Sequence, residues 1–262
     1  MKRMSAILKK ELLSYFKSPI GWVVFAIFMA VGGMYMASSL SYSSADMAGE
    51  IAFLQSMLFI IVPLLTMKTF SDERRNGTEV LLLTSPATLT DIVVGKYLAV
   101  LSVYLLMTFG TVIHIFIVVY FGGLIQISVL GSYIGFVLLG AAYLAIGVFA
   151  SALTESQIIS AVVTFVIILA LNIIDSIASI IGNGVASFLN WIDFLNILPD
   201  DWLTTFGGAI VVGIQWINPS SRLDNILEGV FEIAPLVFFI SLIAVFLFLT
   251  TRIIEKRRWS QR

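Results

Sequence analysis

Long apolar runs separated by short polar stretches dominate the chain. A helix needs about 20 apolar residues to cross the hydrocarbon core of a bilayer. Six runs reach that length and predict membrane spans at residues 20–40, 51–70, 97–121, 130–153, 158–181 and 235–254. The pattern therefore predicts an all-α integral membrane protein with six transmembrane helices.

The residues before the first run, 1–19, predict an amphipathic helix that lies in the membrane interface. Met4, Leu8 and Leu12 recur at helical spacing, whereas the lysines fall on other faces. This segment is either an elbow helix that steadies the first span or a plain basic anchor. Its notable residues are Glu11, an acid inside the apolar arc that needs a partner, Phe16, and Pro19, which marks the turn into the membrane.

The stretch 71–96 is the long charged interruption in the first two thirds of the chain. Asn76-Gly77 predicts a turn, and Thr78-Glu79 after it predicts the start of a short helix. The apolar run 80–83 follows and ends before Pro86. Such a run either dips into the lipid interface or docks into a groove on another protein.

Polar residues form a stripe along the fifth predicted span. At about 100° per residue they fall within an arc of about 120°. The stripe could line a pathway or a subunit seam, or it could only supply interhelical hydrogen bonds of about 0.6 kcal/mol each. Asp175, near the outer end, is expected to be wetted. The stripe consists of Gln157, Ser160, Thr164, Asn172, Asp175 and Ser179.

The second and third spans carry further polar positions. Gln55 in the second span needs an interior partner because lipid offers none, and Pro63 can kink that span. His114 is the single histidine. We expect it to be a packed, hydrogen-bonded residue, since it has no Cys, Asp or Glu in its own span with which to bind a metal.

The region 182–234 is apolar for a loop. Aromatic residues such as Trp191, Trp202 and Trp216 predict amphipathic helical segments at headgroup level. The region either rests on the outer leaflet or offers a docking surface to an apolar substrate or an accessory subunit. A turn at 218–221 is expected to lead into a helix at 222–231.

Composition and charge support a membrane protein and set its orientation. Residues are 59% hydrophobic and 12% charged, against about 25% charged in soluble domains. The net charge of -1 argues against a nucleic-acid partner. Of the 15 lysine and arginine residues, Arg222 alone falls on the far side of the predicted spans. The positive-inside rule therefore places both termini and the 71–96 loop in the cytoplasm.

Motifs for catalysis are missing from the sequence. Gly95-Lys96 is followed by Tyr97 and lacks the earlier glycine and the hydroxyl residue of a phosphate-binding loop. With no cysteine there is no thiolate nucleophile. We expect a non-catalytic chain that binds no cofactor of its own.

Several motifs resemble one family of membrane proteins. They comprise residues 63–67 (PLLTM), 72–75 (DERR), 77–79 (GTE), 81–82 (LL), 85–86 (SP) and 95–96 (GK), with 10–12 (KEL), Tyr15-Phe16, Ser18-Pro19 and the basic tail 252–259. The chain is similar over nearly its whole length to ABC-2 type transporter permeases. It most resembles the gliding-motility-associated subgroup, a relative of the permease for nitrous oxide reductase maturation.

This resemblance implies a single transmembrane domain over 1–262 in the bacterial cytoplasmic (inner) membrane. The domain would pair with a second permease copy or a similar subunit and with two cytoplasmic ATPase subunits, which hold ATP and Mg. An accessory subunit is an open alternative. In the family, the second and fifth spans line the pathway, here Gln55, Ser160, Thr164, Asn172 and Asp175. The coupling helix that docks on the ATPase lies in the 71–96 loop and would use Glu73, Arg74, Arg75, Gly77, Thr78, Glu79, Leu81, Leu82, Leu83 and Pro86.

The leading hypothesis is the membrane subunit of an ATP-driven exporter. A second hypothesis is a membrane anchor that recruits an ATPase for mechanical work outside the cell and moves no solute. A third is a transporter or channel that works without ATP.

Overall fold

The computed structural model describes residues 2–42, 46–84, 86–122, 125–192, 208–209, 211–213, 215–216, 218–227, 229 and 232–260. Among these residues, helices are the only regular secondary structure. The chain divides into two compact units, Met1–Val166 with Asn225–Arg262, and Ile167–Asp224. The prediction of an all-α chain is confirmed for the described residues.

Most helices belong to the first unit. They are α1 (Lys2–Lys17), α2 (Pro19–Ser41), α3 (Met47–Ser56), α4 (Leu58–Thr66), α5 (Ser71–Arg75), α6 (Glu79–Leu83), α7 (Leu89–Tyr120), α8 (Ile127–Leu153) and α12 (Ile233–Ser260), together with the first turns of α9 (Gln157–Ile192). Among the described residues, 5 helices are long and apolar enough to cross a membrane, or 6 if the bent pair α3 and α4 counts as one span. The chain has the helices of a multi-pass membrane protein, and the count of six spans stays a prediction.

Helix α8 forms the centre of the first unit. It contacts α3, α4, α7 and α12, and 78% of its most apolar window is buried. Small residues allow this approach, because a Cβ at Gly140 would overlap the ring of Tyr104 and one at Gly147 would overlap Thr66. Helix α8 therefore holds the surrounding helices in register.

The N-terminal helix meets α2 at a tight corner. The hydroxyl of Ser18 accepts a hydrogen bond from the Ile20 amide at 3.3 Å, and Pro19 opens α2 where a missing donor costs nothing. A Cβ at Gly21 would overlap the Tyr15 carbonyl oxygen, so only glycine fits there. Helix α1 then packs on α7 and α2. Its placement in a lipid interface stays a prediction.

The second predicted span, 51–70, is not one continuous helix. Helices α3 and α4 meet at Met57 with a bend of 55°, well before Pro63, where a kink was expected. A proline ring inside a helix clashes with the carbonyl four residues earlier, which for Pro63 belongs to Phe59 in the first turn of α4. The chain breaks just before that turn, where the Met57 amide bonds to Leu54 in a tighter turn at 3.0 Å.

The predicted loop 71–96 is shorter than expected, because α7 begins at Leu89 and not at Tyr97. Thr88 and Asp91 form a capping box, in which the Thr88 hydroxyl accepts from the Asp91 amide at 3.1 Å. The sequence analysis missed this start signal. As a result Lys96 lies inside a helix, buried against its neighbours.

Helix α9 runs beyond the predicted end of the fifth span at 181, as far as Ile192. Apolar periodicity continues through the glycine at 182, which the helix accommodates, so the predicted outer region 182–234 begins in helix. Within the helix expected at 222–231, the described residues form α11 (Asp224–Leu227) after a 3₁₀ turn (Ser220–Arg222), and Gly229, with a positive φ of 89°, does not continue the helix. Trp202 and the Trp191 side chain lie outside the described residues.

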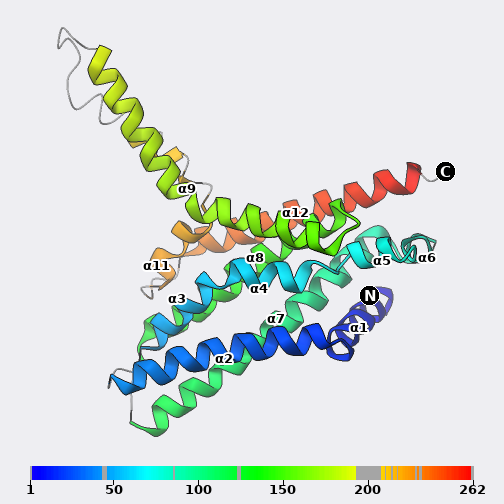
Figure 1. Cartoon of the computed structure of the whole chain (residues 1–262), viewed down its shortest axis with the longest axis horizontal. Coiled ribbons are helices and arrows are strands. Elements are labelled where there is room, and N and C mark those ends of the chain that lie inside the picture. The colour runs from blue at the N-terminus through cyan, green and yellow to red at the C-terminus, as the bar shows by residue number, and fades with distance from the viewer. Residues whose placement is uncertain are drawn as a thin grey trace. The chain divides into compact units, whose positions relative to one another are not determined.

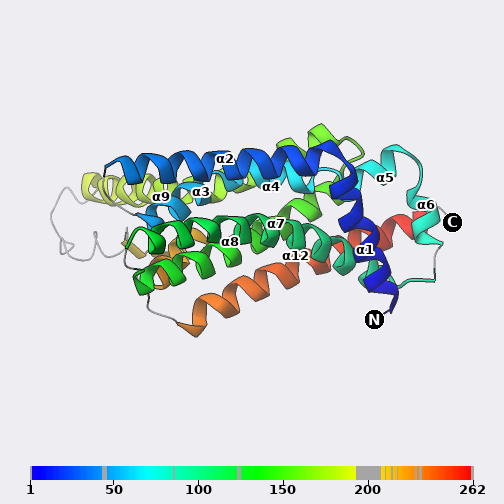
Figure 2. The same ribbon diagram turned by 90° about the horizontal axis from the view of Figure 1, so that it is seen from below.

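Both ends of the first unit's chain approach the predicted cytoplasmic loop. Figures 1 and 2 show α1 and the C-terminal part of α12 at the same end of the helices as α5 and α6. This arrangement is the one that the distribution of basic residues predicts. The side of the membrane on which this end lies stays a prediction.

Candidate functional site

The loop after α4 folds into two short helices joined by a well-defined turn. Helix α5 ends in a Schellman motif, in which the Thr78 amide bonds to the Glu73 carbonyl at 2.9 Å and the Gly77 amide bonds to Arg74 at 3.2 Å. Gly77 has φ 70°, a conformation that favours glycine. The predicted turn at Asn76-Gly77 and the helix start at Glu79 are both present.

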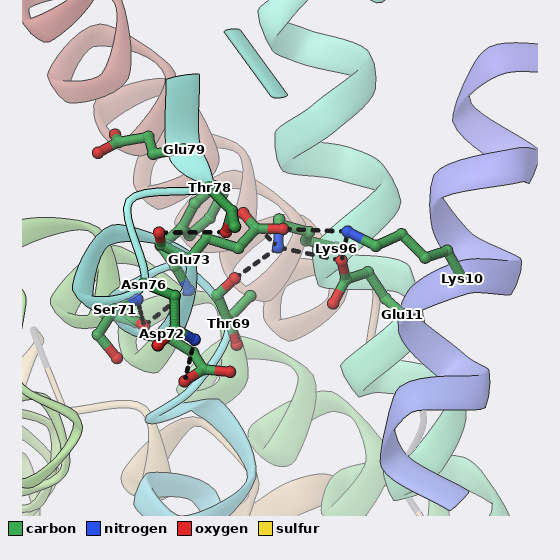
Figure 3. Close-up of polar contacts among 12 residues, drawn as sticks. Lys10, Glu11, Thr69, Ser71, Asp72, Glu73, Asn76, Thr78, Glu79 and Lys96 are labelled. Atoms are coloured by element: carbon green, nitrogen blue, oxygen red, sulfur yellow. Dashed lines mark hydrogen bonds and ion pairs between the residues drawn. The ribbon is translucent and has the colours of Figure 1, made fainter. Parts of the chain in front are cut away.

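Lys96 lies at the centre of an ion cluster that joins this loop to the body of the protein (Figure 3). Its Nζ lies 3.0 Å from Glu73 Oε2 and 3.2 Å from Glu11 Oε1, and it donates to the Thr69 carbonyl at 2.6 Å. The side chain is 1% exposed. The partner that Glu11 was expected to need is therefore a lysine on α7.

Lys10 covers this ion cluster on its outer side. Its ammonium lies 3.2 Å from Glu73 Oε1 and 3.3 Å from Glu11 Oε1. Partial burial lowers the pKa of Lys10, but the two carboxylates outweigh that effect and leave its pKa above the ordinary value. Each carboxylate thus lies between two ammonium groups. Buried charges of this kind need such pairing to be tolerated.

A second set of contacts ties the loop to the ends of α8, α9 and α12. Arg74 Nη2 lies 2.6 Å from Glu155 Oε1, in the α8–α9 connection, and its Nε lies 3.9 Å from Glu79 Oε2. Arg257 of α12 approaches the other oxygen of Glu79 at 3.8 Å. Asp72 accepts a hydrogen bond from Gln157 at 2.7 Å. The loop is therefore held by helices from distant parts of the sequence.

The outward side of the loop is different. Val80 is 50% exposed and Leu81 73% exposed, and Arg75, Thr78 and Pro86 are exposed as well. The side chains of Leu82 and Leu83 lie outside what the structure describes. Apolar side chains at the tip of a charged, fixed loop form a surface suited to a partner.

Two of the predicted pathway residues donate a hydrogen bond to a carbonyl of their own helix. Thr164 donates to the Ser160 carbonyl at 2.8 Å, and Asn172 donates to Ile168 at 2.8 Å, each within α9. Gln55 lies half-buried in α3. Among the described residues no hydrogen bond joins Gln55 to Ser160 or Thr164. The assignment of these residues to a pathway stays a prediction.

Asp175, expected to be wetted, accepts hydrogen bonds from protein groups. Within the second unit, its Oδ2 receives Asn218 Nδ2 at 2.6 Å and Ser221 Oγ at 2.9 Å. The turn at 218–221 supplies both donors. The sequence analysis treated that turn as a helix cap and did not connect it with the stripe.

Sequence analysis also missed a buried pair between α3 and α7. His114 Nδ1 lies 2.6 Å from Glu50 Oε1, and the Glu50 side chain is fully buried. His114 is hydrogen-bonded as expected, but Glu50 was assigned to the connection outside the second span. Asp46 caps α3 through the Gly49 amide at 2.8 Å, which starts the helix early and carries Glu50 inside. The signal was an Asn/Asp-type cap before an apolar run.

Metal chemistry has no support in the part of the chain that the structure describes. No group of three or more His, Asp or Glu side chains there could hold an ion. The clustered polar groups are suited to fixing a loop rather than to bond making.

Comparison with known proteins identifies one family model, described as ABC-2 family transporter protein, that matches residues 5–259. A search of the curated proteins finds no match.

Proposed function

Because the chain belongs to the ABC-2 family of transporter proteins, we propose that it is the membrane-spanning subunit of an ATP-driven exporter whose ATPases are separate chains. The family model covers nearly the whole chain, so the transporter domain accounts for almost all of it. We also propose that the chain falls in the gliding-motility-associated subgroup of this family.

One observation carries the proposal. The loop of α5 and α6 exposes Leu81 on one side, while Glu73, Arg74 and Glu79 bind it to the rest of the first unit on the other. A loop that exposes apolar side chains to a partner and is ion-paired to the helix bundle can transmit a movement of the partner to the bundle. An ATPase drives the transporter only if its contacts with this loop differ between its two nucleotide states.

The partners follow from this role. Two cytoplasmic ATPase subunits bind the loop surfaces, hold ATP and Mg, and carry out hydrolysis. A second permease copy or a similar subunit completes the membrane part. Both chain termini and the α5–α6 loop then face the cytoplasm of a bacterial cell, across its inner membrane.

The direct test replaces Leu81 with a charge. Leu81→Asp removes a docked apolar side chain worth about 2 kcal/mol, which corresponds to roughly 30-fold weaker ATPase binding. The tagged chain is purified from its native membrane in mild detergent, and the ATPase that copurifies and its transport-coupled ATP turnover are measured. Tyr42→Asp is the matched control, because Tyr42 is 83% exposed at the other end of α2.

The expected result is loss of the ATPase with Leu81→Asp and its retention with Tyr42→Asp. If Leu81→Asp keeps normal coupled turnover, the exporter proposal is wrong. A transporter that works without ATP would instead copurify no ATPase and would keep its transport in the Leu81→Asp variant.

A membrane anchor that moves no solute is the second candidate. The hydroxyl of Thr164 is bonded to its own helix, so it is not committed to a partner across a pathway. Thr164→Leu together with Asn172→Leu should abolish transport in an exporter and leave ATPase binding intact. Unchanged function in that double variant would favour the anchor.

A further inference from the structure

A polar cavity of about 210 Å³ lies where α1 meets the segment after α4. Its wall includes the charged side chains of the ion cluster, and also Ser14, Lys68 and Asp72. These three residues are not part of that cluster. They determine what the cavity could hold.

Apart from Asp72, the acids that line the cavity are already paired with bases. Glu11 and Glu73 both pair with Lys10 and Lys96 at 3.0–3.3 Å. A ligand therefore gains little from these four groups, which cancel one another's charge.

Lys68 and Asp72 differ, since neither has a charged partner within ion-pair distance among the described residues. Lys68 Nζ donates to the Ser18 hydroxyl at 2.8 Å and lies 5.8 Å from the centre of the Tyr15 ring. An ammonium has three donors, so Lys68 keeps donors to spare. Asp72 Oδ1 accepts from Gln157 and Asn76, both neutral, and its Oδ2 has no donor in the described part of the chain.

We propose that this cavity binds a phosphate ester that also carries a primary ammonium group, with the phosphate on Lys68 and the ammonium on Asp72. Lys68 and Asp72 act on each other only through space, without an ion pair. They are one positive and one negative charge, which a zwitterion satisfies together and a simple anion does not. Lysine binds phosphate as a point charge. Ser14, whose hydroxyl has no bond within the described residues, adds a donor beside it.

The position of the cavity indicates the source of such a ligand. Lys68 follows the last turn of α4, the end of a predicted span, and α1 has the pattern of an interfacial helix. Trp22, at the start of α2, is 57% exposed, as aromatic residues at headgroup level are. The same chemistry occurs in a phosphatidylethanolamine headgroup and in free O-phosphoethanolamine. The site would bind either one whether or not the loop engages an ATPase.

The test compares lipids on the full-length purified protein by native mass spectrometry. Phosphatidylethanolamine, phosphatidylglycerol and phosphatidylcholine are added in turn, and O-phosphoethanolamine is added separately as a competitor. Phosphatidylglycerol lacks the ammonium, and the methylated ammonium of phosphatidylcholine cannot donate to a carboxylate. The variants are Lys68→Gln and Asp72→Asn, with Lys9→Gln on the exposed face of α1 as the control.

The expected result is preferential retention of phosphatidylethanolamine and about tenfold weaker binding in each variant, the loss of one charged contact. Lys68→Arg keeps the positive charge and should retain binding. Retention would show that Lys68→Gln weakens binding through the lost charge and not through misfolding. Displacement by O-phosphoethanolamine would identify a soluble ligand as an alternative source. Equal retention of phosphatidylglycerol, or variants that behave like Lys9→Gln, would overturn the proposal.

Discussion

The ion cluster between α1, α5 and α7 and the middle of the polar stripe of α9 both place polar groups on an apolar background, but they connect these groups in opposite ways. In the ion cluster, Lys96 bonds to Glu11 and Glu73, which are far from it in sequence. In the stripe, Thr164 bonds to a carbonyl of its own helix. The ion cluster joins elements, whereas Thr164, in the middle of the stripe, bonds only locally. Gln157 and Asp175 of the stripe do bond outside their helix, to Asp72 and to Asn218 and Ser221.

This difference determines which substitutions should affect the packing of one helix against another. Charged pairs between α1, α5 and α7 join the loop to the helices behind it. A hydroxyl bonded to the previous turn stabilises nothing beyond that turn. We therefore expect substitutions in the ion cluster to disturb the protein far more than those in the stripe.

The largest effect should come from Lys96→Met. The change removes the buried ammonium and leaves the half-buried carboxylates of Glu11 and Glu73 with Lys10 alone, which costs about 4 kcal/mol of unfolding free energy. Unfolding in mixed micelles by denaturant measures it. Lys9→Met is the control, because Lys9 is an exposed residue of the same helix, α1, as Glu11. This change should alter stability by less than about 0.5 kcal/mol. Equal stabilities for the two variants would mean that the ion cluster does not hold the fold.

An intermediate effect is expected at the corner that positions Glu11. In Gly21→Ala the new Cβ overlaps the Tyr15 carbonyl, so α1 must move away from α2 at a cost of about 2 kcal/mol. Gly33→Ala is the matched change in the same helix. It meets no atom within 4 Å and should be neutral or stabilising by up to about 1 kcal/mol. Thermal unfolding of both variants decides between these outcomes, and a harmless Gly21→Ala would refute the role of the corner.

The smallest effect should come from Thr164→Val. The variant keeps the shape of the side chain and loses a bond within one helix, so the unfolding free energy should fall by about 0.6 kcal/mol or less. Thr250→Val provides the comparison, because Thr250 is equally buried and donates to Phe246 in its own helix at 2.7 Å. A loss at Thr164 several times that at Thr250 would show that Thr164 also forms contacts between elements.

The sequence predicted one member of the ion cluster, because an acid inside an apolar arc is conspicuous. Glu11 could be recognised as an acid that needs a base, and the turn at Asn76-Gly77 has a known signature. The identity of the base could not be predicted, since pairing Glu11 with Lys96 requires α1 to pack on α7. That contact depends on tertiary packing, and periodicity carries no information on it.

Helix limits were predicted less well, for local reasons. The caps at Asp46 and Thr88 each start a helix earlier than the apolar run does. The first shift buries Glu50 and the second buries Lys96. Hydropathy marks where lipid would surround a helix, whereas hydrogen bonding at the cap marks where the helix starts.

The central claim is that the exposed face of α6 is where a separate ATPase binds. The chain contains no cysteine, so Leu81→Cys introduces a single thiol at that face. Its rate of reaction with a maleimide is measured in the permease alone and in the complex purified with its ATPase, with Tyr42→Cys as the reference. We predict that the ATPase protects the thiol at position 81 and leaves the thiol at position 42 unchanged. Equal reactivity at position 81 in both preparations would contradict the account.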